Sequence, residues 1–213
     1  ILNRVDVIFV PQGNEDGVSC ARSIVESIIS RPKLFVELTF PMTKNKKILK
    51  AYWKRSAQSI AQDIEKGRQA AFVTIGDPFI YSTYIYLLRT LRQNFPHIPV
   101  ETIPGINSFN AASCAAGIPL AEGNEKLAVL AVKKNLEGVK KALKEFDTVV
   151  LMKVGAKLDK VISLLRQMHL LESSTLISRL GHPNERIIRD LTSLKDKKSG
   201  YLYNSYQYSL LRE

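Results

Sequence analysis

Short apolar runs alternate with amphipathic helical patterns along nearly the whole chain. The runs are rich in β-branched residues and have the length of buried strands, whereas the helical segments repeat apolar residues every three or four positions. This order is typical of a mostly parallel sheet that is covered by helices on both faces. We therefore expect an α/β fold in which strands and helices take turns.

The expected elements divide into two sets. In the first half, strands are expected at residues 5–10, 34–40, 70–75 and 99–103, and helices at 16–29, 45–66 and 83–92. In the second half, strands are expected at 127–132, 148–152, 174–177, 186–191 and 201–208, and helices at 111–116, 136–146 and 158–168. The last two strands have no helix between them, which favours a mixed sheet. We expect an N-terminal α/β lobe over residues 1–104 and a C-terminal α/β lobe over residues 105–213.

The net charge of +11 on 213 residues is the compositional outlier. Such a charge favours an acidic partner, which can be nucleic acid, an anionic membrane surface or a polyanionic small molecule. The lysines are spread along the chain, mostly on expected polar helix faces, where solvation is the ordinary role. No motif of an RNA-reading module is present, so nucleic acid is not the expected partner.

Compartment and metal content follow from cysteine, histidine and hydropathy patterns. No apolar run approaches the ~20 residues that span a bilayer, and no signal peptide precedes the first expected strand. Cys20 and Cys114 lie far apart and form no C-x-x-C pair. We therefore expect a reduced, cytoplasmic protein with two buried thiols. The three histidines share no metal-ligand spacing, so no metal site is expected.

Three glycine-centred loops each follow an expected strand. They contain G-D-P at 76–78, P-G-I-N-S at 104–108 and L-G-H-P at 180–183. Open α/β sheets bind ligands at the carboxyl ends of their strands, and glycine allows the backbone to approach a ligand closely. Each loop alone is equally well explained as an ordinary turn; the ordered combination is the stronger signal. No P-loop, G-x-G-x-x-G or G-x-S-x-G motif is present.

Four motifs carry a family resemblance that covers nearly the whole chain. They are G-D-P-F-I-Y-S-T-Y-I-Y-L at 76–87, I-P-G-I-N-S-F at 103–109, A-G-I-P-L at 116–120 and V-V-L-M-K-V-G at 149–155. Together they resemble the tetrapyrrole methylases. The Y-S-T after G-D-P and the N-S-F after P-G-I resemble the branch that methylates precorrin-2, or its cobalt form, at C20 in cobalamin biosynthesis. The resemblance implies an S-adenosylmethionine-dependent methyltransferase with its cofactor in a cleft between two lobes.

The resemblance also assigns site residues. The implied cofactor contacts are Ile75, Gly76, Asp77, Ile80, Asn107, Ser108, Met152 and Gly181. Without the resemblance, packing in the core is the better explanation for Met152. The implied substrate has eight carboxylates, which gives the positive charge a purpose. Candidate substrate residues are Tyr81, Ser82, Thr83, Arg179 and Arg186. Helix capping explains Ser82 and Thr83 equally well, surface ion pairs are an alternative for each arginine, and no catalytic base is evident.

One expected element has no counterpart in the sequence. Members of this family open with a short strand and a loop of the type G-x-G-P-G-D-P, and no such stretch stands before Val5. We therefore expect one wall of the cofactor site to be missing from this sequence. Alternatives that remain open are a tetrapyrrole methylase acting at another ring position, a ribosomal RNA methylase of the same fold, and a non-catalytic binding module. The family also implies a homodimer.

Overall fold

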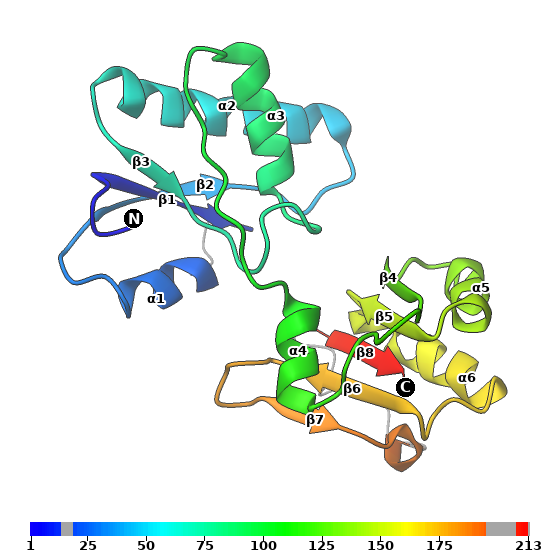
Figure 1. The fold of residues 1–213 in the computed structure, drawn as a ribbon. Coiled ribbons are helices and arrows are strands. Elements are labelled where there is room, and N and C mark those ends of the chain that lie inside the picture. The colour runs from blue at the N-terminus through cyan, green and yellow to red at the C-terminus, as the bar shows by residue number, and fades with distance from the viewer. Residues whose placement is uncertain (14–18, 195–207, 213) are drawn as a thin grey trace. The chain divides into compact units, whose positions relative to one another are not determined.

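Strands and helices alternate in the computed structural model, which describes residues 1–13, 19–194 and 208–212 (Figure 1). The chain forms two compact units, Ile1–Gly105 and Ile106–Glu213. Each unit has its own sheet and its own apolar clusters. The expectation of an α/β fold is confirmed.

The first unit is a parallel three-layer arrangement. Its strands are β1 (Val7–Gln12), β2 (Leu34–Thr39) and β3 (Ala70–Phe72), in the order β2-β1-β3, and all pairs are parallel. Its helices are α1 (Cys20–Glu26), α2 (Lys46–Glu65) and α3 (Tyr84–Asn94). Figure 1 shows α1 on one face of the sheet and α2 with α3 on the other.

Side-chain alternation along β1 explains these layers. Val7 and Phe9 belong to the apolar cluster that contains residues of α2 and α3. Ile8 and Val10 point the other way and join the cluster that contains Val25 of α1. A strand that is buried on both faces reads as a continuous apolar run, as parallel sheets require. The sequence pattern of β1 therefore fixes a central position in the sheet.

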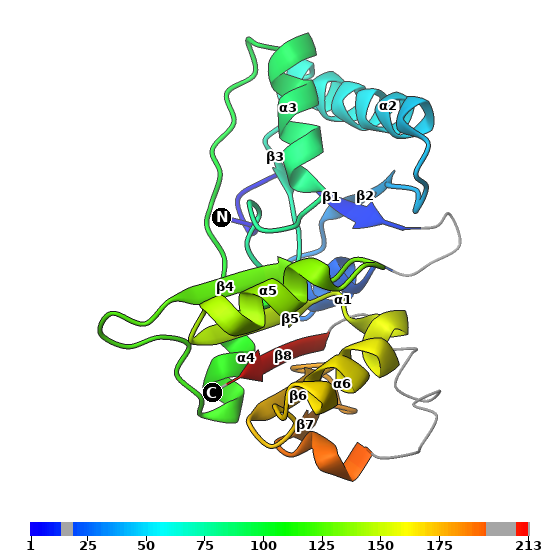
Figure 2. The same ribbon diagram turned by 90° about the vertical axis from the view of Figure 1, so that its right-hand side faces the viewer.

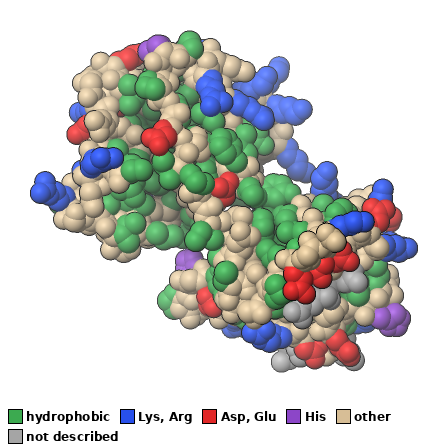
Figure 3. Space-filling model, viewed as in Figure 1, with side chains coloured by type: hydrophobic (Ala, Val, Ile, Leu, Met, Phe, Trp, Pro, Cys, Tyr) green, Lys and Arg blue, Asp and Glu red, His purple; other side chains and the backbone are tan. Residues whose placement is uncertain are grey.

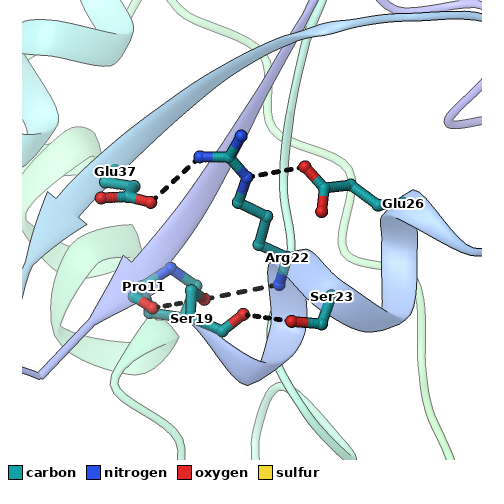
Figure 4. Close-up of polar contacts among 6 residues, drawn as sticks. All are labelled: Pro11, Ser19, Arg22, Ser23, Glu26 and Glu37. Atoms are coloured by element: carbon teal, nitrogen blue, oxygen red, sulfur yellow. Dashed lines mark hydrogen bonds and ion pairs between the residues drawn. The ribbon is translucent and has the colours of Figure 1, made fainter. Parts of the chain in front are cut away.

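Helix α1 is attached to the ends of β1 and β2 by polar contacts (Figure 4). The Ser19 hydroxyl donates to the carbonyl oxygen of Pro11 at 2.8 Å and accepts from the backbone N–H of Arg22 at 3.4 Å. The Arg22 guanidinium donates to Glu26 at 2.8 Å and to Glu37 of β2 at 3.2 Å. The carboxylates of Glu26 and Glu37, which accept these hydrogen bonds, raise the pKa of Arg22.

The second unit has a mixed sheet. Its strands are β4 (Leu127–Ala131), β5 (Thr148–Met152), β6 (Ser174–Ser178), β7 (Arg186–Ile188) and β8 (Tyr208–Arg212), in the order β4-β5-β8-β6-β7. Its helices are α4 (Ser108–Ala116), α5 (Glu137–Glu145) and α6 (Leu158–Gln167), with 3₁₀ turns at Gly155–Lys157 and Leu191–Leu194. Strands β4 and β5 are parallel, and the other pairs are antiparallel. The expected mixed sheet is confirmed.

Strand β5 divides the core of this unit in two. Val149 and Leu151 belong to the cluster that contains the buried faces of α5 and α6. Val150 and the half-buried Met152 pack in the cluster that contains Phe109 of α4. Figure 2 shows α5 and α6 together on one side of the sheet. The α4 helix ends at Gly117, whose φ of 67° is the left-handed conformation that glycine adopts at low cost.

One expected strand is not formed, and another lies mostly outside the described residues. The segment 99–103 is not a strand, because its backbone pairs with none of the described strands. It runs instead beside α3, where the Thr102 and Tyr84 hydroxyls share a hydrogen bond. Of the expected strand at 201–208, residues 201–207 lie outside the described part of the chain, and the described strand there begins at Tyr208.

The expectation of two buried thiols is wrong. Cys20 and Cys114 are both exposed. Cys20 is the first residue of α1, and Cys114 lies on α4 between the positions that pack on the sheet. Among the helices of the described residues, none is long and apolar enough to cross a membrane.

Candidate functional site

Two of the glycine loops meet in the first unit. A Cβ atom built on Gly105 would lie 2.5 Å from the carbonyl oxygen of Gly76 and 3.2 Å from its carbonyl carbon. Real Cβ contacts are not that short, so only glycine at position 105 allows this approach. Gly76 itself has a φ of 77°, which also favours glycine. Both glycines are therefore required by the way the two loops pack.

Asp77 ties these loops together. One carboxylate oxygen accepts the backbone N–H of Phe79 at 2.8 Å, which closes the turn after β3. The other oxygen accepts the backbone N–H of Gly105 at 3.3 Å. The carboxylate thus holds two segments that are 28 positions apart in the sequence.

Side-chain hydroxyl groups form hydrogen bonds near the same loops. The Ser82 and Thr74 hydroxyls lie 3.0 Å apart, and Ser82 also accepts the backbone N–H of Tyr84 at 3.2 Å. The Tyr84 and Thr102 hydroxyls are 2.5 Å apart. Ser82 is buried, so its hydroxyl stabilises the start of α3, as the capping alternative predicts. Thr83 occupies the N-cap position without a side-chain capping bond.

The outer side of the loop is apolar and exposed. Ile75, Phe79, Ile80 and Tyr81 expose between 37% and 55% of their surface. Tyr81 has a φ of 53°, the left-handed region that non-glycine residues adopt at a cost. An apolar surface beside backbone amides suits a ligand with a flat ring and polar substituents. Phe79 is a candidate that sequence reasoning missed, although its place in the G-D-P motif is a usable signal.

In the second unit, the candidate residues near α4 have defined structural roles. Asn107 is the N-cap of α4, and its side-chain oxygen accepts the backbone N–H of Asn110 at 2.9 Å. Ser108 is the first residue of the helix and is half-buried. Met152 ends β5 and packs in the α4 cluster. Core packing thus accounts for part of the Met152 side chain, and its half-exposed remainder lies at the carboxyl end of β5.

The third glycine loop follows β6. Gly181 has a φ of 77°, and its N–H donates to the Glu185 carboxylate at 2.7 Å. Arg179 directly follows the last residue of β6, Ser178, and Arg186 pairs with Ser178 across the antiparallel β6–β7 ladder. The structure therefore brings both candidate arginines to the same end of β6.

Positive charge is also concentrated in the first unit. Lys44, Lys46, Lys47 and Lys50 are exposed in the loop after β2 and in the first turns of α2. Figure 3 shows lysine and arginine side chains gathered on the side of this unit where α2 begins. The first turn of α2 has no acidic residue, so the lysines there oppose the helix dipole. In the described parts of the chain, no group of three or more His, Cys, Asp and Glu residues is arranged to hold a metal ion.

Comparison with known proteins gives consistent results. Residues 1–195 match the family model of the tetrapyrrole (corrin/porphyrin) methylases. The chain is 34% identical over 204 residues to a probable cobalt-precorrin-2 C(20)-methyltransferase of Methanocaldococcus jannaschii, covering 91% of this chain and 85% of that protein. It is 32% identical over 198 residues to the cobalt-precorrin-2 C(20)-methyltransferase of Salmonella typhimurium, covering 93% and 82%.

Solved structures share the fold. A cobalt precorrin-4 methyltransferase superposes with a TM-score of 0.72 at 16% identity, covering 99% of this chain and 85% of that one. A uroporphyrin-III C-methyl transferase from Thermus thermophilus, complexed with S-adenyl homocysteine, superposes with a TM-score of 0.62 at 18% identity, covering 100% and 87%. At such identities the likeness establishes the architecture alone.

Proposed function

This chain belongs to the tetrapyrrole (corrin/porphyrin) methylases, and we propose that it transfers a methyl group from S-adenosylmethionine to C20 of precorrin-2 or cobalt-precorrin-2. The observation that carries the proposal is the alignment of more than nine-tenths of the chain with two relatives of that name. The Y-S-T and N-S-F residues in the two first glycine loops support the same branch. The net charge of +11 suits a polycarboxylate substrate.

The cofactor contacts that we propose come from both units. They are Ile75, Gly76, Asp77 and Ile80 in the first unit, and Asn107, Ser108, Met152 and Gly181 in the second. Their chemistry fits the cofactor, because exposed apolar side chains suit the adenine ring, and backbone amides suit its polar atoms. The bonds of Asp77 to Phe79 and Gly105 support this role, since they fix the loop before any ligand arrives.

Methyl transfer requires alignment more than acid–base chemistry. S-Adenosylmethionine supplies an electrophilic methyl group on its sulfonium when bound. The part that we assign to this chain is to hold the acceptor carbon in line and to exclude water. Tyr81 and Thr83 are exposed at the loop surface and are the proposed substrate contacts there. Ser82 is buried, so we assign it an effect on the substrate only through the position of its neighbours.

Arg179 and Arg186 are the proposed carboxylate contacts of the second unit. A guanidinium binds a carboxylate through two parallel hydrogen bonds, which fixes its orientation as well as its position. Both arginines lie beside Ser178 at one end of β6. They thus suit neighbouring carboxylates of one substrate molecule.

The decisive experiment is incubation of the full-length protein with methyl-labelled S-adenosylmethionine and precorrin-2, with and without inserted cobalt. Label is expected on C20 of one or both tetrapyrroles, located by NMR. Label at another ring carbon would assign a different tetrapyrrole methylase. Cofactor binding without transfer to either tetrapyrrole would overturn the proposed reaction.

Assembly and compartment are further parts of the proposal. By family resemblance we assign a cytoplasmic homodimer. Light scattering coupled to size exclusion tests the assembly, since one chain has a mass of 23.9 kDa. A species of one-chain mass at micromolar concentration would contradict the dimer.

A further inference from the structure

A few residues of this chain adopt a backbone conformation that side chains disfavour. Among the described residues, the non-glycine positions with positive φ are Tyr81 (53°), Lys153 (57°), His169 (57°) and Arg179 (54°). This conformation costs free energy because the Cβ atom crowds the following carbonyl oxygen. His169 has an ordinary reason for it. It follows the C-cap of α6, and the next N–H, that of Leu170, donates to the Leu165 carbonyl at 2.9 Å, as in many helix ends.

The positive φ of Lys153 and of Arg179 is not explained by the end of a helix. Lys153 directly follows the last residue of β5, and Arg179 directly follows the last residue of β6. Gly155 and Gly181, two positions further along each loop, also have positive φ. Each loop thus has two residues with positive φ. The second is glycine, which adopts this conformation at low cost, and the first, directly after the strand, is a cationic residue. Such strain persists where the surroundings demand it, most often at functional sites.

The sheet topology places these two cations at one edge. Strand β8 is antiparallel to both β5 and β6, so β5 and β6 run in the same direction. Their carboxyl ends therefore share one edge, and Met152 and Ile177 both pair with Ser209 of β8. Because one strand separates β5 from β6, their axes are about 10 Å apart.

Other cations end at the same edge. Strand β4 is parallel to β5, and the exposed Lys133 lies two positions after the last residue of β4. Arg186 pairs with Ser178 at the end of β6, and the Lys157 ammonium donates to the Lys153 carbonyl oxygen at 3.1 Å. The Glu185 carboxylate is in the same loop and accepts the Gly181 N–H. Positive charge from separate segments of the chain thus converges on this edge.

We propose that Lys153 and Arg179 form a carboxylate-binding pair that holds two separate carboxylates of the tetrapyrrole substrate. The inference rests on the proposed function and adds Lys153, and the pairing itself, to the residues assigned above. A separation of about two strand spacings between their backbones allows the two cations to contact different carboxylates. It suits two acidic side chains on the rim of one flat ring. The left-handed backbone conformation places Lys153 directly after β5 and Arg179 directly after β6, where we propose that the rim of the substrate binds.

The test is a binding measurement that needs no methyl transfer. Uroporphyrin III, an octacarboxylate, and its octamethyl ester, which has the same ring and no free carboxylate, are titrated against the protein and followed by fluorescence. Lys153→Gly and Lys153→Met are each expected to raise the Kd for uroporphyrin III about tenfold, as loss of one charge-assisted contact does. Lys153→Arg is expected to stay within about twofold, and the Kd for the octamethyl ester is expected to change by less than about twofold in every variant. Arg179→Met is expected to match Lys153→Met.

Controls separate binding from folding. Lys153→Gly relieves the strained conformation, so its Tm is expected to equal or exceed that of the wild type. Lys160→Met removes an exposed lysine of α6 in the same unit and is expected to leave every Kd within about twofold. The affinity for S-adenosylhomocysteine, measured by calorimetry, is expected to be unchanged in all variants.

Three results would overturn the pair. They are an unchanged Kd for uroporphyrin III in both Lys153 variants, an equal loss for both porphyrins, and a weakened affinity for S-adenosylhomocysteine with unchanged porphyrin binding. The last would assign the cations to the carboxylate of the cofactor. Because no arm requires turnover, these results are distinguishable from failure of the methyl-transfer experiment.

Discussion

The two units present different chemistry at the carboxyl ends of their strands. In the first unit, the loops after β3 and before α4 hold each other through a glycine–glycine approach and the carboxylate of Asp77. Their outer surface is apolar. In the second unit, the corresponding edge carries Lys153, Arg179 and Arg186. One edge is thus organised by close backbone packing, and the other by charge.

The two edges therefore suit different parts of an amphiphilic ligand. Backbone amides and apolar side chains discriminate by shape, and they tolerate very little displacement. Cations discriminate by charge and act over longer distances, but salt screens them. Substitutions in the first unit should therefore alter affinity through geometry, whereas those in the second should alter it through charge and ionic strength.

The largest effect is expected from Gly105→Ala. The added methyl group must displace the Gly76 carbonyl, from which it would be only 2.5 Å away. We expect a loss of about 2 kcal/mol in the free energy of unfolding, as for other overpacked sites. A displacement near 1 Å in the loop should also lower methyl-transfer activity about 100-fold. Urea denaturation and the labelled-cofactor assay measure the two quantities.

Gly138→Ala is the matched control for that variant. Gly138 lies in α5, and no atom is within 4 Å of a Cβ placed on it. Alanine there should stabilise the protein by about 0.5–1 kcal/mol, because glycine is a poor helix residue. If Gly105→Ala were equally harmless, the close approach of the two loops would be wrong.

A smaller effect is expected from Asp77→Ala. This change leaves the Phe79 and Gly105 amides without their carboxylate acceptor. We expect a loss of about 1.5 kcal/mol in stability and a rise of about tenfold in the Kd for S-adenosylhomocysteine, measured by calorimetry. Asp77→Asn keeps an acceptor oxygen and should lose less. Equal affinities for the wild type and both variants would remove Asp77 from the site.

A still smaller effect is expected from the hydroxyl pair of Tyr84 and Thr102. Thr102→Val leaves the Tyr84 hydroxyl without this partner and should cost about 1 kcal/mol. Adding Tyr84→Phe should recover most of that loss, because neither side of the bond then remains unsatisfied. Urea denaturation of the two single variants and the double variant completes the cycle. Strictly additive losses would show that the bond contributes nothing.

The smallest effect is expected from charge reversal at the start of α2. Lys46→Glu and Lys47→Glu place an acid in the first turn, where it complements the helix dipole. Each should raise stability by about 0.5 kcal/mol. At physiological salt, where the screening length is about 8 Å, the Kd for uroporphyrin III should change by less than about threefold. A tenfold change would place the carboxylate site in the first unit and contradict the division described above.

Much of the fold was predictable because it depends on local patterns. The alternation of buried strands and amphipathic helices indicated the α/β class, and the helix expected at 111–116 ends at the same residue as α4. The segment 99–103 has strand-like residues and yet forms no strand. A strand exists only with a paired neighbour, and pairing is not encoded in the segment itself.

The site was less predictable for the same reason. The glycine motifs indicated which loops matter, but the contact of Gly105 with Gly76 joins loops that are far apart in the sequence. The burial of Ser82 and the position of Thr102 likewise depend on tertiary packing. Cys20 and Cys114 were predicted to be buried because cysteine usually is. Both are exposed, since each lies on the solvent side of a helix.

The place of β8 between β5 and β6 has a consequence for the order of events during synthesis. This strand is made after every other strand among the described residues, yet it occupies the middle of the sheet in the second unit. Until it arrives, β5 and β6 each present an unpaired backbone edge of the kind that invites aggregation. The first unit contains only earlier segments and can fold while the ribosome is still at work. Completion of the second unit, and of its charged edge, is therefore a late and vulnerable step.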